Sequence, residues 1–205
     1  MLVQAERRDL LVIGSSRKAP VGCIGIGKRT RQLLGHAACP LAIAPLGLHE
    51  HPDYAIKRVG VGYDGGPESS AALELAAATA HALGAELIVR TVVDDRVPVP
   101  GWARISEPPL AGWPEAVADE VKAMRERLTT AIRDCGVAAD GEVLTGRPAD
   151  ALRTMCDSVD VLVIGSRHWG PVSRLIAGST GEAMMHSSPC PLLLVPRPAD
   201  AAKRE

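Results

Sequence analysis

Two kinds of apolar pattern alternate along the chain from residue 57 onward, and their order predicts an α/β fold. Short runs rich in Val, Leu and Ile predict strands, and longer runs with apolar positions three or four residues apart predict helices. The predicted strands are Lys57–Tyr63, Glu86–Val93, Val137–Leu144, Val161–Ile164 and Leu192–Val195. The predicted helices are Glu68–Leu83, a helix that opens at Pro114, Pro148–Asp157, and one within Gly178–Ser187. This alternation predicts a parallel sheet with helices on both faces.

The fully apolar run Val161–Ile164 is typical of a central parallel strand. We therefore expect a doubly wound, Rossmann-like five-stranded parallel sheet with strand order 3-2-1-4-5. In that order the first and fourth strands meet where the winding reverses, which is where such sheets bind ligands. Asp64 follows the first strand and Gly165 follows the fourth. Both residues are therefore expected at one crevice.

An internal repeat precedes this pattern. Residues 9–45 match residues 160–196 at a constant offset of 151. The coinciding positions include Asp9/Asp160, Val12/Val163, Ile13/Ile164, Gly14/Gly165, Ser15/Ser166, Pro20/Pro171, Gly27/Gly178, Cys39/Cys190, Pro40/Pro191 and Pro45/Pro196. An offset of domain length indicates a tandem duplication rather than a solenoid. We interpret residues 1–46 as the C-terminal remnant of a first domain, 47–56 as a linker, 57–198 as a complete domain and 199–205 as a tail.

Composition narrows the classes of partner. The net charge of -1 argues against nucleic acid or an anionic membrane as the main partner, and 2% aromatic residues argue against a base-stacking platform. There is no apolar run long enough to span a membrane and no signal-peptide pattern. Five cysteines without a CxxC pair indicate neither a disulfide framework nor a zinc site, and we interpret them as small buried hydrophobic residues. We expect a cytoplasmic protein.

The predicted crevice carries residues suited to an anion. Gly165-Ser166-Arg167-His168-Trp169-Gly170 follows a buried strand, and Gly178-Ser179-Thr180 opens a helix. Glycines let backbone N–H groups approach an anion, and a helix N-terminus adds unpaired donors and a favourable dipole. Ser179 and Thr180 could donate to phosphate. The alternative is a strand–turn–helix joint with a serine cap, and Arg147, in a predicted strand-to-helix turn, is a lesser candidate for a phosphate contact.

These segments resemble the universal stress protein family, whose nucleotide-binding members carry G-x-x-G, nine residues and then G-[ST]. Val61–Leu73 (VGYDGGPESSAAL) resembles the family's first strand and loop, and Gly178–Pro196 resembles its closing helix and strand. The resemblance covers Lys57–Pro196 as a full domain and Asp9–Pro45 as a closing half.

The resemblance implies a stress-response module that binds or senses an adenine nucleotide, ATP with or without Mg²⁺, and that is not an enzyme. Carried over residue by residue, Gly165, Gly178 and Ser179 would hold phosphates, and Asp64 would lie beside the ribose or a metal-bound phosphate. Val92 would meet the adenine through its backbone. The expected nucleotide-binding set is Asp64, Val92, Gly165, Arg167, His168, Gly170, Gly178, Ser179 and Thr180, with no catalytic residue and no resident metal.

Two departures from the family motif leave alternatives open. His168 stands where the second motif glycine is expected, and a histidine there would resist a positive φ. In the first copy, Arg17 and Lys28 replace motif residues, so at most one complete crevice is expected. The chain could instead be a dimerising stress protein that does not bind nucleotide. A nucleotide-hydrolysing enzyme is a weaker alternative, because no general base is evident.

The resemblance also implies pairing of the closing strands. We expect Leu41–Pro45 to pack beside Leu192–Pro196, either as an internal pseudo-dimer or in a homo-oligomer. The N-terminal remnant lacks its own first three strands and should expose apolar surface, which favours self-association.

Overall fold

The computed structural model of the chain describes residues 9–28, 30–31, 39–96, 112–166 and 179–196. Its strands are β1 (Leu11–Gly14), β2 (Leu41–Ala44), β3 (Arg58–Gly62), β4 (Glu86–Val93), β5 (Ala139–Thr145), β6 (Val161–Gly165) and β7 (Leu192–Val195). Its helices are the 3₁₀ helix η1 (Leu48–Glu50), α3 (Pro67–Leu83), α4 (Trp113–Asp134), α5 (Pro148–Met155) and α6 (Ser179–Ser187). The elements expected from residue 57 onward are all present, with ends that shift by a few residues at most.

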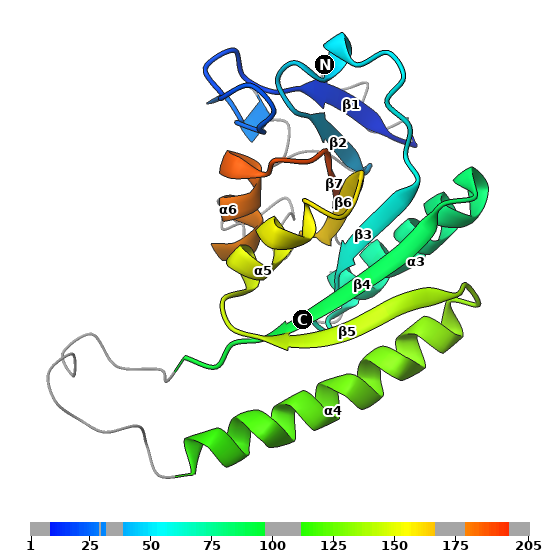
Figure 1. Cartoon of the computed structure of the whole chain (residues 1–205), viewed down its shortest axis with the longest axis vertical. Helices are drawn as coiled ribbons and strands as arrows, with labels where there is room; N and C mark the ends of the chain where they lie inside the picture. Colours follow the sequence, from blue (N-terminus) through cyan, green and yellow to red (C-terminus); the bar gives the residue numbers. More distant parts are fainter. Residues whose placement is uncertain (1–8, 29, 32–38, 97–111, 167–178, 197–205) are drawn as a thin grey trace, which may run out of the picture.

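All seven strands form one sheet in the order β1-β2-β7-β6-β3-β4-β5 (Figure 1). Neighbouring strands are parallel except β2 and β7, which are antiparallel. The five strands from β3 to β7 confirm the predicted order 3-2-1-4-5. The sheet is larger than the five strands predicted, because β1 and β2 of the N-terminal segment extend it beyond β7.

The pairing of β2 with β7 confirms that Leu41–Pro45 packs beside Leu192–Pro196 within this chain. Leu41 lies opposite Leu194, and Ile43 lies opposite Leu192. The division of the chain into a remnant, a linker, a complete domain and a tail stays a prediction.

Helices cover the sheet on two faces, and each face has its own core. α5 and α6 pack on one face, where Ile24, Leu41 and Ile43 of the N-terminal segment join the same apolar cluster. α3 and α4 pack on the other face, over residues such as Val61 of β3 and Val163 of β6. The N-terminal segment therefore shares a hydrophobic core with the rest of the chain.

The ends of α3 follow from its flanking residues. Pro67 occupies the first turn, where a missing N–H costs nothing. Gly84 follows the last turn with φ of 63°, and its N–H reaches the carbonyl groups of Ala80 and His81. Both features agree with the predicted start and stop signals. This helix start matters for function, because it sets the loop that follows β3.

The segment before β3 is tied to the start of β6 by Asp160. The carboxylate of Asp160 accepts hydrogen bonds from the backbone N–H groups of Lys57 and Arg58, each at 2.8 Å. The hydroxyl of Tyr54 donates to the Asp160 carbonyl. Burial, together with the nearby charge of Asp160, raises the pKa of Tyr54 to about 12.

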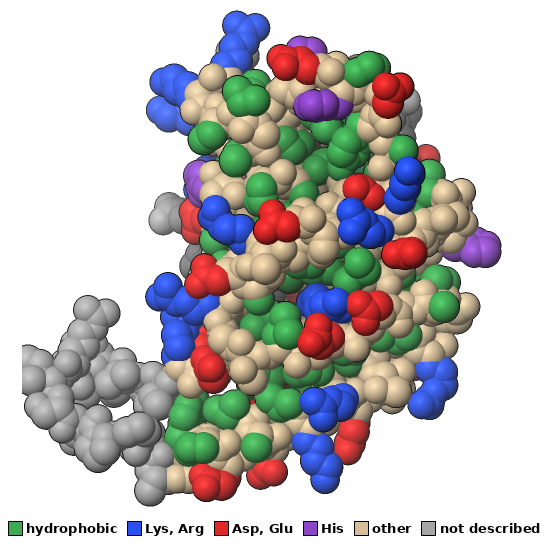
Figure 2. Space-filling model, viewed as in Figure 1, with side chains coloured by type: hydrophobic (Ala, Val, Ile, Leu, Met, Phe, Trp, Pro, Cys, Tyr) green, Lys and Arg blue, Asp and Glu red, His purple; other side chains and the backbone are tan. Residues whose placement is uncertain are grey.

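Charged side chains of both signs are interspersed on the face drawn in Figure 2, in keeping with the balanced composition. Within the part of the chain that the structure describes, no helix combines the length and the apolarity needed to cross a bilayer.

Candidate functional site

A cavity of about 270 Å³ lies at the carboxyl ends of β3 and β6. These two strands are hydrogen-bonded neighbours, as the predicted order requires. The cavity therefore occupies the crevice where the winding of the sheet reverses, the usual ligand position in open α/β sheets.

The cavity brings together every predicted site residue that the structure describes. Its walls include Asp64, Val92, Gly165, Ser179 and Thr180. The other predicted residues, Arg167, His168, Gly170 and Gly178, lie outside the described residues. Five positions from four separate segments of the sequence thus meet in one place.

Asp64 is held in a defined turn between β3 and α3. Its carboxylate oxygen Oδ1 accepts a hydrogen bond from the Gly66 N–H at 2.9 Å, and its own N–H donates to the Ser69 hydroxyl at 3.2 Å. The Ser69 hydroxyl donates in turn to the Gly66 carbonyl at 2.9 Å. Gly65 between them has φ of 80°, which a residue with a Cβ rarely adopts. The turn fixes the carboxyl group at the edge of the cavity.

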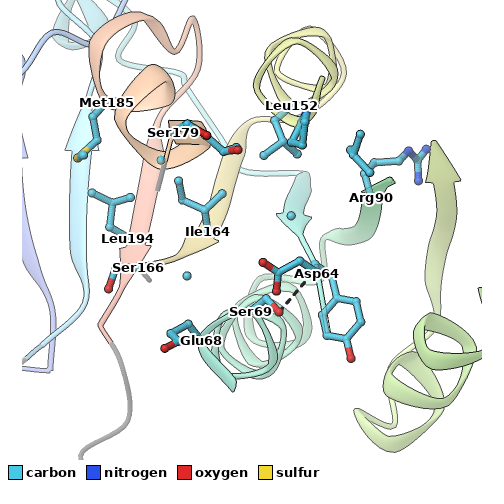
Figure 3. A pocket seen from close by; sticks show the side chains of 17 residues that line it. Asp64, Glu68, Ser69, Arg90, Leu152, Ile164, Ser166, Ser179, Met185 and Leu194 are labelled. Atoms are coloured by element: carbon cyan, nitrogen blue, oxygen red, sulfur yellow. Dashed lines mark hydrogen bonds between the residues drawn. The ribbon is translucent and has the colours of Figure 1, made fainter. Parts of the chain in front are cut away.

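The cavity has a polar side at α3 and a mixed opposite side (Figure 3). Asp64, Glu68 and Ser69 lie on the side of α3. The opposite side carries large apolar side chains from α5, α6, β6 and β7, namely Leu152, Met185, Ile164 and Leu194, beside the hydroxyl groups of Ser166 and Ser179. A mostly apolar pocket with a few placed polar groups is typical of small-molecule sites.

The backbone of Val92 faces this cavity because of strand register. The N–H of Tyr63 donates to the carbonyl of Arg90 at 2.9 Å, so the polar backbone groups of Arg90 point toward β3. Residues two apart in a strand direct these groups to the same side. Val92 therefore directs its N–H and C=O toward β3 as well, at a point where β3 has already ended at Gly62.

Gly165 has a packing role that sequence reasoning did not identify. A Cβ added there would lie 2.4 Å from the carbonyl oxygen of Glu68 and 2.9 Å from the amide nitrogen of Ser69. The end of β6 and the first turn of α3 are thus in contact through backbone alone. The glycine is needed for this close approach whether or not a phosphate binds beside it.

Two buried hydroxyl groups, those of Ser166 and Thr91, have no hydrogen-bond partner among the described residues. Ser166 is 5% exposed and lines the cavity, whereas Thr91 is not among the lining residues. Ser15, the counterpart of Ser166 in the N-terminal repeat, is satisfied: its hydroxyl donates to the Ala44 carbonyl at 2.8 Å and accepts from the Gly25 N–H at 3.4 Å. An unsatisfied buried hydroxyl costs free energy, so the orphan oxygen of Ser166 is a candidate ligand contact.

The first turn of α6 also opens on the cavity. Ser179, Thr180 and Gly181 line it. The first N–H groups of a helix have no partner within the helix, and they carry the positive end of its dipole. This wall can bind an anion.

Arg90 lines the cavity but was not predicted. Its guanidinium forms ion pairs with Asp140 at 2.8 Å and with Glu142 at 3.3 Å on β5, and Figure 3 shows it directed away from Asp64. Arg90 lies two residues before Val92 on the same strand, and this spacing could have identified it in the sequence as a residue near the cavity. Its acidic partners could not be identified from the sequence, because they depend on the β4–β5 register.

The lesser candidate Arg147 precedes α5 as expected, and it is not among the residues that form the cavity wall.

Comparison with known proteins agrees with this fold. The Universal stress protein family model matches residues 55–196. A universal stress protein of Thermus aquaticus is 33% identical over 147 residues, covering 68% of this chain and 98% of that protein. A universal stress protein of Mycobacterium tuberculosis (strain ATCC 25618 / H37Rv) is 27% identical over 197 residues. That match covers 95% of this chain but only 64% of the relative, so the chain spans less than two thirds of this longer protein.

Solved structures show the same architecture. A universal stress protein from Archaeoglobus fulgidus DSM 4304 aligns with a TM-score of 0.70 and 22% identity, over 96% of this chain and 65% of that one. A universal stress protein solved in complex with cAMP aligns with a TM-score of 0.51 and 25% identity, over 70% of this chain and 99% of that one. On the family match and the Thermus relative together, this chain belongs to the universal stress protein family.

Proposed function

We propose that the chain binds an adenine nucleotide, ATP, in the cavity between β3 and β6, as a binding or sensing module of the stress response. Membership of the family supports the general role. The relative solved in complex with cAMP supports an adenine nucleotide as the class of ligand.

The observation that carries the proposal is the orphan hydroxyl of Ser166 in the same cavity as the N-terminus of α6. Ser179 and Thr180 add hydroxyl donors on that wall. Hydroxyl and backbone N–H donors beside a helix N-terminus favour a phosphate group. A bound phosphate would give the Ser166 hydroxyl the acceptor that it lacks among the described residues.

The remaining walls suit the other parts of a nucleotide. Ring nitrogens and an exocyclic amine of adenine can pair with the outward N–H and C=O of Val92. Leu152 and Met185 offer apolar surface to the flat base. The Asp64 carboxylate can accept hydrogen bonds from ribose hydroxyl groups.

No cluster of three or more His, Cys, Asp or Glu side chains is found among the described residues. In this proposal any Mg²⁺ enters as part of the nucleotide complex, bound to its phosphates.

We further propose that the site binds without turnover. Membership of the family supports this, because the resemblance implies a binding module rather than an enzyme. The competing proposal is a protein that acts only through subunit pairing. The exposed edge strand β1 favours that candidate, because an apolar edge can pair with a second chain.

Isothermal titration of the full chain with ATP, with and without Mg²⁺, tests the function. The proposal expects saturable 1:1 binding to ATP that is weaker for GTP. Absence of binding at millimolar ATP would overturn it and favour the pairing protein. Sustained phosphate release in the same samples would instead contradict binding without turnover.

A further inference from the structure

Two cysteines that the nucleotide site does not use lie in contact at the opposite end of the strands, near the amino ends of β6 and β7. Cys156 directly follows α5, and Cys190 lies just before β7. Their Sγ atoms are 2.7 Å apart, within about 0.7 Å of the disulfide bond length of roughly 2.05 Å. Both side chains are buried, with 6% and 4% exposure, and both thiols are free.

We propose that Cys156 and Cys190 form a site of reversible oxidation, at which a hydroperoxide converts the two thiols into an intramolecular disulfide. The inference is independent of nucleotide binding. It rests on the juxtaposition of the two sulfur atoms and on the polar frame around them.

The frame is built by Ser188, which is fully buried. Its Oγ lies 3.5 Å from the sulfur of Cys156 and 3.7 Å from that of Cys190, and it donates to the Cys190 carbonyl at 2.8 Å. The backbone of Ser188 is fixed on both sides, since its N–H bonds the Met184 carbonyl and its C=O accepts from the Ile24 N–H. The two thiols thus lie against a hydrogen-bonded loop as well as within apolar packing.

The contact also separates the roles of the two sulfurs. The hydrogen bond that Cys190 donates lowers the pKa of Cys156 to about 7. The same contact, with burial, raises the pKa of Cys190. Cys156 is therefore the more acidic of the two thiols and the one that more readily forms the nucleophilic thiolate.

The reaction balances with hydrogen peroxide as the oxidant. The Cys156 thiolate attacks one peroxide oxygen, an S–O bond forms, the O–O bond breaks, and the leaving hydroxide takes up a proton to become water. Cys190 then loses its proton and attacks the Cys156 sulfur, so that the S–S bond forms and the S–O bond breaks. The second hydroxide leaves with that proton as water. In sum, two thiols and one peroxide give one disulfide and two waters, and an added dithiol reverses the reaction by exchange.

The bond would join the far ends of two helices whose near ends line the cavity. α5 contributes Leu152 to the cavity wall and is followed by Cys156. α6 begins with Ser179 at the cavity and leads through Ser188 to Cys190. Oxidation therefore closes a covalent loop that includes β6 and α6. The loop restricts the unfolded chain, which stabilises the folded state.

Peptide mapping of the full chain after peroxide treatment and thiol blocking tests the proposal. We expect a monomer on a non-reducing gel, a mass loss of about 2 Da for the two hydrogens removed, and a Cys156–Cys190 linked peptide that dithiothreitol abolishes. Cys156→Ser and Cys190→Ser should each lose it, and Cys135→Ser, which removes a thiol elsewhere, should keep it. Oxidised wild type should melt roughly 5 to 10 °C above the reduced form. Blocking of both thiols in peroxide-treated native protein, or links to other cysteines instead, would overturn the proposal.

Discussion

Ala42 of β2 and Leu193 of β7 lie directly opposite each other, and they occupy equivalent positions in the two repeats. The flanking pairs, Leu41 with Leu194 and Ile43 with Leu192, are arranged symmetrically about them. Equivalent residues of two copies meet only where a two-fold axis passes between them. The β2–β7 contact therefore has the local symmetry that the tandem interpretation predicts, although that interpretation stays a prediction.

A second pair of equivalent positions in the two repeats carries opposite charges. Arg31 and Glu182, also 151 residues apart, form an ion pair at 3.3 Å, and Arg31 also lies 2.7 Å from the His186 ring. Arg31→Glu should destabilise the protein by about 0.5 to 1 kcal/mol, because it places like charges together at a partly exposed site. Urea unfolding at low and high salt measures this.

The charge-swapped double variant is the control for this ion pair. Arg31→Glu combined with Glu182→Arg should recover most of the lost stability, and salt should reduce every difference. Equal stability of the single and the double variants would show that the pair does not contribute.

The close contact of Gly165 with α3 predicts a large effect of one methyl group. Gly165→Ala should lower the free energy of unfolding by about 3 kcal/mol, since backbone at 2.4 Å cannot move aside as a flexible side chain would. Gly181→Ala is the matched control. Its Cβ would meet only Ile164 at 3.9 Å, and the change should gain about 0.5 kcal/mol of helix stability. Denaturant unfolding measures the stability of both variants. A Gly165→Ala variant at least as stable as Gly181→Ala would refute the packing role of Gly165.

The hydroxyl of Tyr54 predicts an alkaline loss of stability. The folded pKa of about 12 lies above the ordinary value of 10.0, so the folded state favours the protonated hydroxyl. This contribution is complete below pH 10 and is lost as the pH rises toward 12. Stability measured at pH 9 and 11.5 should fall more for wild type than for Tyr54→Phe. Identical pH profiles would contradict a role for the contact with Asp160.

The edge strand β1 predicts self-association, as expected from the sequence. Val12 is 64% exposed on this strand, and Leu10 and Val21 nearby are 47% and 77% exposed. An apolar edge strand is prone to pair with another chain. Light scattering should show a molecular mass that rises with concentration, and Val12→Lys should reduce the rise. A monomer at every concentration would be the opposite result.

The sequence predicted the fold from residue 57 onward well, because its signals are local. The apolar runs predicted the first and last residues of β4 and β7 correctly, and Pro67 and Gly84 marked the ends of α3. The convergence of Asp64 and Gly165 followed from strand order alone.

Features that depend on packing between distant residues could not be predicted. The ion pairs of Arg90 require the β4–β5 register, and the contact of Cys156 with Cys190 requires the ends of α5 and α6 to meet. Ser166 and Ser15 occupy the same motif position, yet only the Ser15 hydroxyl has a hydrogen-bond partner among the described residues, and the sequence could not predict this difference.

These two serines also provide the most direct test of the nucleotide site. Ser166→Ala removes a hydroxyl with no described partner, so it should leave the melting temperature unchanged or higher while weakening ATP binding about fivefold to tenfold, the value of one hydrogen bond. Ser15→Ala removes a satisfied hydroxyl outside the cavity, so it should lower the melting temperature and leave ATP affinity unchanged. Titration of ATP into both variants and wild type measures the difference. Equal affinity of Ser166→Ala and wild type would contradict phosphate binding at the end of β6.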